Sequence, residues 1–135
     1  MKTGLVSRVR GRRGNLLASE CPSRTVLDHV TSRWGVLVLV QLLEGERRFS
    51  ALAREIGGVS EKMLAQTLQQ LEADGFVARE VVPSVPPKVS YSLTPLGSSI
   101  AEHVRELALW IEANLPQVMR QRARYAERKA ALVGA

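Results

Sequence analysis

The residues best suited to do chemistry in this chain are amide and ammonium groups on one face of an expected helix near its middle. In that helix Leu64, Leu68 and Leu71 recur at i, i+4 and i+7, which indicates a single buried stripe. Helical spacing then places Lys62 and Gln66 on the outer face. A glutamine amide can pair with adenine N6 and N7 in the DNA major groove, and a lysine ammonium can bind guanine O6 or N7.

Four side chains of this helix are therefore predicted to contact DNA bases. Lys62 and Gln66 come first, because they lie near the N-terminal end, which is the end that docks in the groove. The alternative is an ordinary solvated helix face. The predicted base-contacting residues are Lys62, Gln66, Thr67 and Gln70.

This helix is expected to be the second of a pair. The run Ser50–Gly75, SALAREIGGVSEKMLAQTLQQLEADG, indicates two short amphipathic helices. Gly57 and Gly58 lie between them, and glycine can adopt the positive φ that a tight turn requires. Ser50 and Ser60 are the expected N-caps of the two helices.

Two strands are expected after the helix pair. Val77–Val82 and Val89–Thr94 are rich in β-branched residues, and the second alternates apolar and polar residues. The link between them contains three prolines and should be stiff. Helix, tight turn, helix and β-hairpin is the layout of a winged helix-turn-helix, whose second helix enters the major groove.

Three further helices complete the prediction. The first begins at Pro22, because proline suits the first turn of a helix. The second covers Arg33–Leu43 with Ser32 as its cap, and its apolar sequence indicates the centre of the core. The last is long, has Thr94 as its cap and Pro95 as its first residue, and should be broken or kinked by Pro116. The expected fold class is mainly α with a small antiparallel β-hairpin.

Phosphate contacts are expected around the same helix. The free N–H groups that follow Ser60 can hold a phosphate at the helix N-terminus. Basic side chains of the hairpin and of the link before the helix pair would fix the position of the protein on the duplex without reading sequence. These expected backbone and wing residues are Arg47, Arg48, Arg79 and Lys88.

Composition is consistent with an anionic partner. The 135 residues carry a formal net charge of +6 and a pI of about 10.2. Basic residues crowd both ends, so we expect a basic arm over 1–20, the winged domain over 21–115 and a basic helical extension over 116–135.

No apolar run reaches the roughly 18 residues of a membrane span. No signal peptide is recognised, and a single cysteine favours a reducing cytoplasm, with the protein at the nucleoid.

Several segments match one family. They are Cys21 before the first helix, Trp34 in the second, GERRFSALAREIGGVSEKML, LEADGFVAREVVPSVPPKVSYSLTPLG, and Trp110. In these segments, which span about 21–115, the chain resembles the bacterial HxlR-type winged helix transcription regulators. The resemblance implies a homodimer that binds a pseudo-palindromic operator and represses or activates a nearby gene.

The resemblance also implies that the first helix and a long C-terminal dimerisation helix form the dimer interface, here through Val26, Leu27, Leu107, Trp110 and Ile111.

The sequence departs from the family pattern in two places. Family members often carry Glu at the position of Ser90, and Arg or Lys at the positions of Thr67 and Gln69. The recognition helix is thus less basic than usual, which leaves its base preference open.

Cys21 supports a second hypothesis. It precedes a helix N-terminus and lies three residues from Arg24, and both features lower the pKa of a thiol. Some relatives sense oxidants or electrophiles with a cysteine here, so a redox or small-ligand sensor with an unknown effector is the alternative function. A small residue packed at the dimer interface is the simpler explanation of Cys21.

Other classes of function find little support. Cys21, His29 and His103 lack the spacing of a metal site. The chain has neither a G-x-x-x-x-G-K loop nor a G-x-S-x-G elbow. We therefore expect no enzyme activity, no metal and no cofactor. A third hypothesis, a winged helix adaptor that binds other proteins, stays open.

Overall fold

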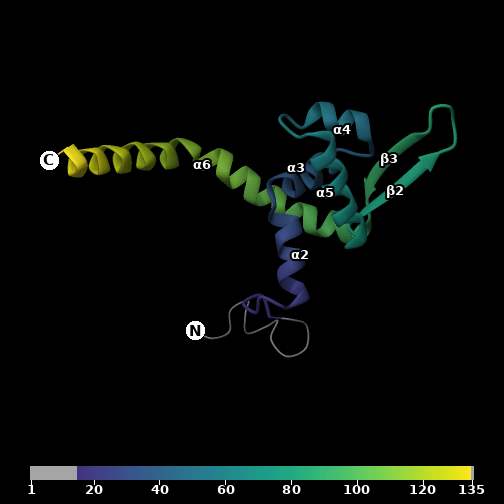
Figure 1. Cartoon of the computed structure of the whole chain (residues 1–135), viewed down its shortest axis with the longest axis horizontal. Helices are drawn as coiled ribbons and strands as arrows, with labels where there is room; N and C mark the ends of the chain where they lie inside the picture. The colour runs from purple at the N-terminus through teal and green to yellow at the C-terminus, as the bar shows by residue number, and fades with distance from the viewer. Residues whose placement is uncertain (1–14, 135) are drawn as a thin grey trace. The chain divides into compact units, whose positions relative to one another are not determined.

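The computed structural model describes residues 15–134, so most of the expected basic arm lies outside the described residues (Figure 1). The described part divides into two compact units, with the division between Val104 and Arg105. The elements in chain order are α2 Pro22–Thr31, α3 Arg33–Leu42, β1 Arg47–Arg48, α4 Phe49–Glu55, α5 Glu61–Ala73, β2 Val77–Val82, β3 Lys88–Leu93 and α6 Pro95–Gly134.

The first unit has a helical core. Leu64, Leu68 and Leu71 of α5 are buried, as the i, i+4, i+7 stripe predicts. Val38 and Leu39 of α3 are fully buried against them, so the apolar α3 is at the centre of the core, as expected. Because apolar burial is the main favourable term in folding, this packing determines which face of α5 remains exposed.

The sheet has three antiparallel strands in the order β1-β3-β2. In the hairpin of β2 and β3, Arg79 pairs with Tyr91 and Val82 with Lys88. On the other side of β3, Arg47 pairs with Tyr91 and Arg48 with Ser90. The expected mainly α fold with an antiparallel hairpin is confirmed, and Figure 1 shows the hairpin extending beside α5.

Local capping explains where most helices begin. The hydroxyl of Ser32 accepts from the N–H of Gly35, that of Ser60 from Met63, and that of Thr94 from Gly97. These three predicted caps are confirmed, and each satisfies one of the free N–H groups of a helix start. In the turn between α4 and α5, Gly58 has a φ of 85°, which favours glycine.

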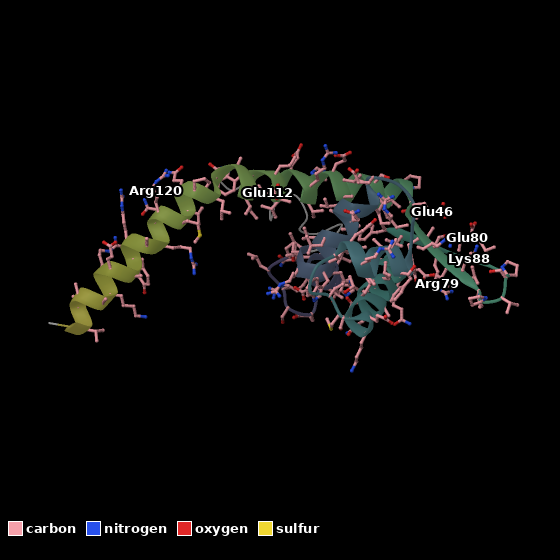
Figure 2. The ribbon with its side chains drawn as sticks, turned by 90° about the horizontal axis from the view of Figure 1, so that it is seen from above. Glu46, Arg79, Glu80, Lys88, Glu112 and Arg120 are labelled. Carbon is pink, nitrogen blue, oxygen red and sulfur yellow. The ribbon has the colours of Figure 1, made fainter. Side chains whose placement is uncertain are left out.

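One expectation about a helix start is wrong. Ser50 does not cap α4, because α4 begins one residue earlier at Phe49, directly after β1, and its cap residue Arg48 makes no side-chain cap bond. Pro116 does not break the last helix, because α6 continues through it to Gly134, but Figure 2 shows α6 bending between Glu112 and Arg120, the alternative that the sequence predicts. Pro116 is exposed, so water can satisfy the carbonyl that lacks its usual N–H partner.

A hydrogen-bonded pair ties α2 to the end of α5. His29 Nδ1 lies 2.6 Å from Asp74 Oδ2, and both side chains are largely buried. Asp74 is the C-cap residue of α5. The pair therefore fixes the C-terminal end of this helix to the first helix of the unit, at a sequence separation of 45 residues.

Candidate nucleic-acid interface

The outer face of α5 is open to solvent. Lys62, Ala65, Gln66 and Gln69 are exposed, whereas Gln70 is half-buried. The exposure of Lys62 and Gln66 agrees with the face predicted from helical spacing. Base contact by these side chains stays a prediction.

Thr67 is a correction to the predicted base-contacting set. Its side chain is only 5% exposed, and its hydroxyl donates to the carbonyl of Met63 at 2.8 Å. Thr67 follows Leu64 by three residues and precedes Leu71 by four, so it shares the buried face of α5. A threonine hydroxyl on a helix is commonly satisfied by the i−4 carbonyl, and this one is not available to a base.

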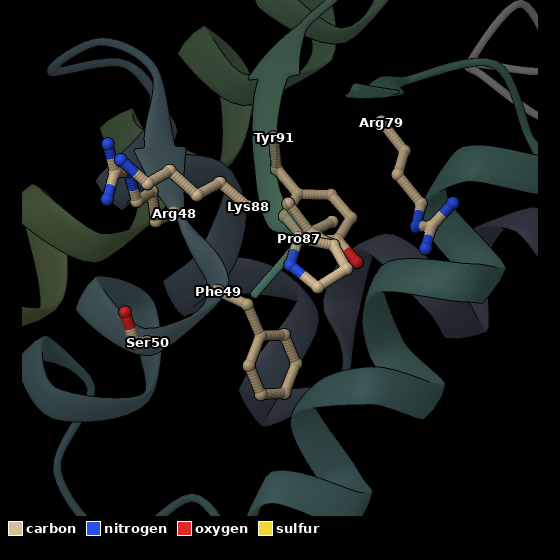
Figure 3. Close-up of a pocket in the computed structure, with 8 residues that line it drawn as sticks. Arg48, Phe49, Ser50, Arg79, Pro87, Lys88 and Tyr91 are labelled. Carbon is tan, nitrogen blue, oxygen red and sulfur yellow. The ribbon is translucent and has the colours of Figure 1, made fainter. Parts of the chain in front are cut away.

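A basic groove lies between the hairpin and the start of α4. It has a volume of about 380 Å³, and its lining contains three cations and no carboxylate. Figure 3 shows Arg48 and Lys88 on one side of Pro87 and Tyr91, and Arg79 on the other. The residues that line the groove are Arg48, Phe49, Ser50, Arg79, Pro87, Lys88, Val89 and Tyr91.

The groove adjoins the outer face of α5. A second hollow is lined by Ala65, Gln69 and Glu72 of α5 together with Arg79 and Tyr91 of the hairpin. Arg79 and Tyr91 thus belong to both hollows and join the helix face to the wing. The role of Tyr91 was missed from the sequence, because an apolar–polar alternation predicts only that a strand residue faces inward.

The two faces of the hairpin differ in charge. Successive strand residues point to opposite faces, so Arg79 and Glu80 are separated. The hollow on the other face is lined by Glu46 and Glu80 together with Arg48 and Lys88. Figure 2 shows Glu46, Glu80 and Lys88 near one another at the hairpin. By the same register Arg48 and Lys88 lie on the Glu80 face and line both hollows, whereas Arg79 is the cation of the hairpin on the face that continues toward α5.

Arg47 differs from its neighbour Arg48. The Nε of Arg47 donates to Glu55 Oε1 at 3.2 Å, and its Nη1 donates to the carbonyls of Gly45 and Glu46. The guanidinium thus stabilises the link between α3 and α4. We correct the expected phosphate-contacting set accordingly and retain Arg48, Arg79 and Lys88, which are all exposed.

Cys21 has a polar environment that favours its thiolate. Its Sγ lies 3.1 Å from the Ser23 hydroxyl and accepts from the N–H of Asn15 at 3.2 Å. The pKa of this thiol is lowered, first by the Ser23 hydroxyl and then by backbone N–H groups, against smaller opposing effects of desolvation and of Glu20. The expected effect of Arg24 is wrong, because its guanidinium donates instead to the carbonyls of Leu16 and Leu17.

The expected dimer residues are apolar and mostly exposed in the single chain. Val26 packs partly against the core of its own unit, and Leu27 on the same helix is 38% exposed. In the second unit Leu107, Trp110 and Ile111 are each about half exposed. A lone chain therefore leaves large apolar side chains in water, as surfaces that bind partners do.

Comparison with known proteins identifies the family to which this chain belongs. The HxlR-like helix-turn-helix family matches residues 29–119, which include the α4–α5 pair, the hairpin and the first part of α6. The chain belongs to the HxlR-like helix-turn-helix family. It is a transcriptional regulator with a DNA-binding helix-turn-helix fold.

Three relatives illustrate the similarity. YtfH of Escherichia coli (strain K12), named an uncharacterized HTH-type transcriptional regulator, is 66% identical over 108 residues, which are 80% of this chain and 86% of the relative. The solved structure of the regulator ytfH from Salmonella typhimurium aligns with a TM-score of 0.80 and 64% identity, over 82% of this chain and 99% of that one. The redox regulator HypR in its reduced form aligns with a TM-score of 0.67 and 34% identity, over 73% of this chain and 98% of that one.

Residues 15–134 contain neither a candidate membrane-spanning helix nor a candidate metal site. None of the helices in this range is long and apolar enough to cross a membrane. Among these residues no group of three or more His, Cys, Asp or Glu side chains could hold a metal ion.

Proposed function

We propose that this protein is a homodimer that binds a pseudo-palindromic operator through α5 and the basic groove beside its hairpin. It would act in the cytoplasm on nucleoid DNA, without catalysis. The observation that carries the proposal is the joined surface of exposed amide and ammonium groups on α5 and the carboxylate-free groove beside it. The side chains on α5 can contact base edges, and the cations of the groove can neutralise phosphates.

The two parts of this surface would work together. The N–H groups at the start of α5, behind the Ser60 cap, can hold one phosphate where the helix enters the groove. Lys62 and Gln66 would then face base edges, with Gln70 at the margin of the contact. Arg48, Arg79 and Lys88 would contact the adjoining backbone. Two copies related by a two-fold axis would read half-sites about one helical turn apart.

The proposal is tested by selecting bound fragments from the source genome with the purified full chain. We expect a small set of fragments that share an inverted repeat. The affinity should fall steeply with salt, with a slope of log K against log salt near −5 if the dimer neutralises about six phosphates. Random duplex of equal length is the control. Equal retention of all fragments, or an affinity that ignores salt, would contradict the proposal and favour the adaptor hypothesis.

A redox-sensing regulator is the second candidate function, favoured by the lowered pKa of Cys21. HypR, named a redox regulator, is similar to this chain, although its likeness does not assign a role to Cys21 here. In the proposed reaction, the Cys21 thiols of two subunits lose two protons and two electrons to hydrogen peroxide. They form one disulfide, and the peroxide becomes water. A lowered pKa leaves more thiolate at neutral pH, which is the reactive form.

The sensor function predicts a difference between the wild type and Cys21→Ser. Peroxide should convert wild type to a linked dimer on a non-reducing gel and change its operator affinity. Cys21→Ser should do neither, and dithiothreitol should reverse the effect in wild type. An identical response of the two proteins would end this hypothesis and leave the DNA-binding proposal intact.

A further inference from the structure

The C-terminal end of α5 is closed by a three-residue turn. Asp74 is the cap residue of the helix, and Gly75 follows it with a φ of 85°. The N–H of Phe76 then donates to the carbonyl of Leu71 at 2.9 Å. This bond closes a Schellman motif, in which a glycine takes the left-handed conformation directly after the helix. We call residues 74–76 the terminal turn of α5.

Two other helices are hydrogen-bonded to the terminal turn. From α2, His29 Nδ1 lies 2.6 Å from Asp74 Oδ2, and only 19% and 14% of the two side chains are exposed. From α6, the hydroxyl of its cap residue Thr94 donates to the carbonyl of Gly75 at 2.6 Å and accepts from the N–H of Gly97 at 2.9 Å. The end of α5 is therefore bonded to α2 through one residue and to α6 through the next.

The start of α6 also lies in direct contact with the backbone of the terminal turn. Gly97 is buried, and a Cβ at this position would overlap the carbonyl oxygen of Phe76. The same oxygen accepts from the N–H of Thr94 at 3.1 Å. No side chain lies between the two backbones to absorb a shift, so the first turn of α6 and the terminal turn should move together.

The same two helices carry the residues that are expected at the dimer interface. Val26 and Leu27 belong to α2, and Leu107, Trp110 and Ile111 belong to α6. The leucine stripe of α5 holds this helix on the core through apolar contacts, which are not directional. Hydrogen bonds do depend on angle, so those at the terminal turn constrain the direction of α5 relative to α2 and to the start of α6.

The length of α5 makes this direction important. The helix has 13 residues, which corresponds to a length of about 20 Å. Lys62 and Gln66 lie nearer to the end opposite the terminal turn. A tilt of about 10° at the terminal turn would shift that opposite end by about 3.4 Å, which is the rise of one base pair. A small change at the terminal turn is therefore enough to alter the separation of half-sites that two subunits can contact together.

We propose that the terminal turn, through its bonds to His29 and Thr94, determines the separation of half-sites that the dimer recognises. His29, Asp74 and Thr94 are positioning residues, because they contact no base and hold α5 in a fixed direction relative to the helices that would join the subunits. The inference rests on the proposed homodimer and operator, and it adds the residues that set the geometry between the two half-sites. Base preference within a half-site belongs to the outer face of α5.

The separation preference is measured with the selected operator and with versions whose half-sites are one base pair closer together or farther apart. The affinity of wild type should be highest at the native separation. His29→Ala and Thr94→Val each remove one bond to the terminal turn. Each should reduce the preference for the native separation at least about fivefold and leave the base preference within each half-site unchanged. His29→Asn and Thr94→Ser keep a hydrogen-bond donor, so both should retain the wild-type preference.

Asp28→Ala is the matched control on α2, because Asp28 is exposed and adjacent to His29, and it should leave the separation preference unchanged. Thermal unfolding and sedimentation check that each variant is a folded dimer. Because the two bonds come from different helices, a variant that fails to fold leaves the other variant to decide. Folded dimers of His29→Ala or Thr94→Val that keep the wild-type preference would overturn the inference and leave the proposed function standing. A wild type that binds the operator no better than random duplex would instead overturn the proposed function.

Discussion

Replacing Arg48, Arg79 and Lys88 together by alanine should lower the affinity for the selected operator by at least about 100-fold at 0.1 M salt. The three side chains are exposed around one groove whose lining contains no carboxylate, so a phosphate in this groove would contact only cations among the charged groups of its lining. The slope of log K against log salt should also become shallower, by about 5 units per dimer at most. The affinity for random duplex should fall by a similar factor, because backbone contacts carry little sequence information.

A matched charge change separates the groove from net charge. Replacing Arg120, Arg124 and Arg128 by alanine removes the same number of cations from the second unit, and none of the three lines the groove. The salt slope of this control should stay close to that of wild type. Equal losses in the two triple variants would show that overall charge, not the groove, supplies the affinity. Thermal unfolding of each variant checks that the fold is retained.

Local sequence signals predicted α5 well. The leucine stripe of α5 and its Ser60 cap both depend on residues within one or two turns, and both are confirmed. Thr67 could also have been assigned to the inner face, since it lies three residues from Leu64 and four from Leu71.

Long-range contacts limited the remaining predictions. The different roles of Arg47 and Arg48 depend on β1, which pairs with β3 more than 40 residues later. The start of α4 at Phe49 has the same origin, because the strand ends where the helix begins. The pair of His29 and Asp74 joins helices that sequence periodicity treats separately. No local sequence pattern indicates which distant residue a side chain contacts.

The second large effect is expected at one base pair of each half-site, in the Gln66→Ala variant. Gln66 is exposed near the N-terminal end of α5, where a recognition helix contacts base edges. A bidentate amide contributes about 1–3 kcal/mol of discrimination against the wrong base. Removing it should therefore weaken the preference for adenine at that position by roughly 10- to 100-fold and leave the other positions unchanged. Thr67→Val is the matched control, because the neighbouring side chain is buried and should not affect base preference.

The most direct measurement is the affinity of wild type, Gln66→Ala and Thr67→Val for the selected operator with every base pair replaced in turn. The account predicts that Gln66→Ala abolishes the preference at one position per half-site, while Thr67→Val retains the full wild-type profile. A Gln66→Ala protein that binds every duplex more weakly by one common factor, or that keeps the wild-type profile, would contradict base recognition by the outer face of α5.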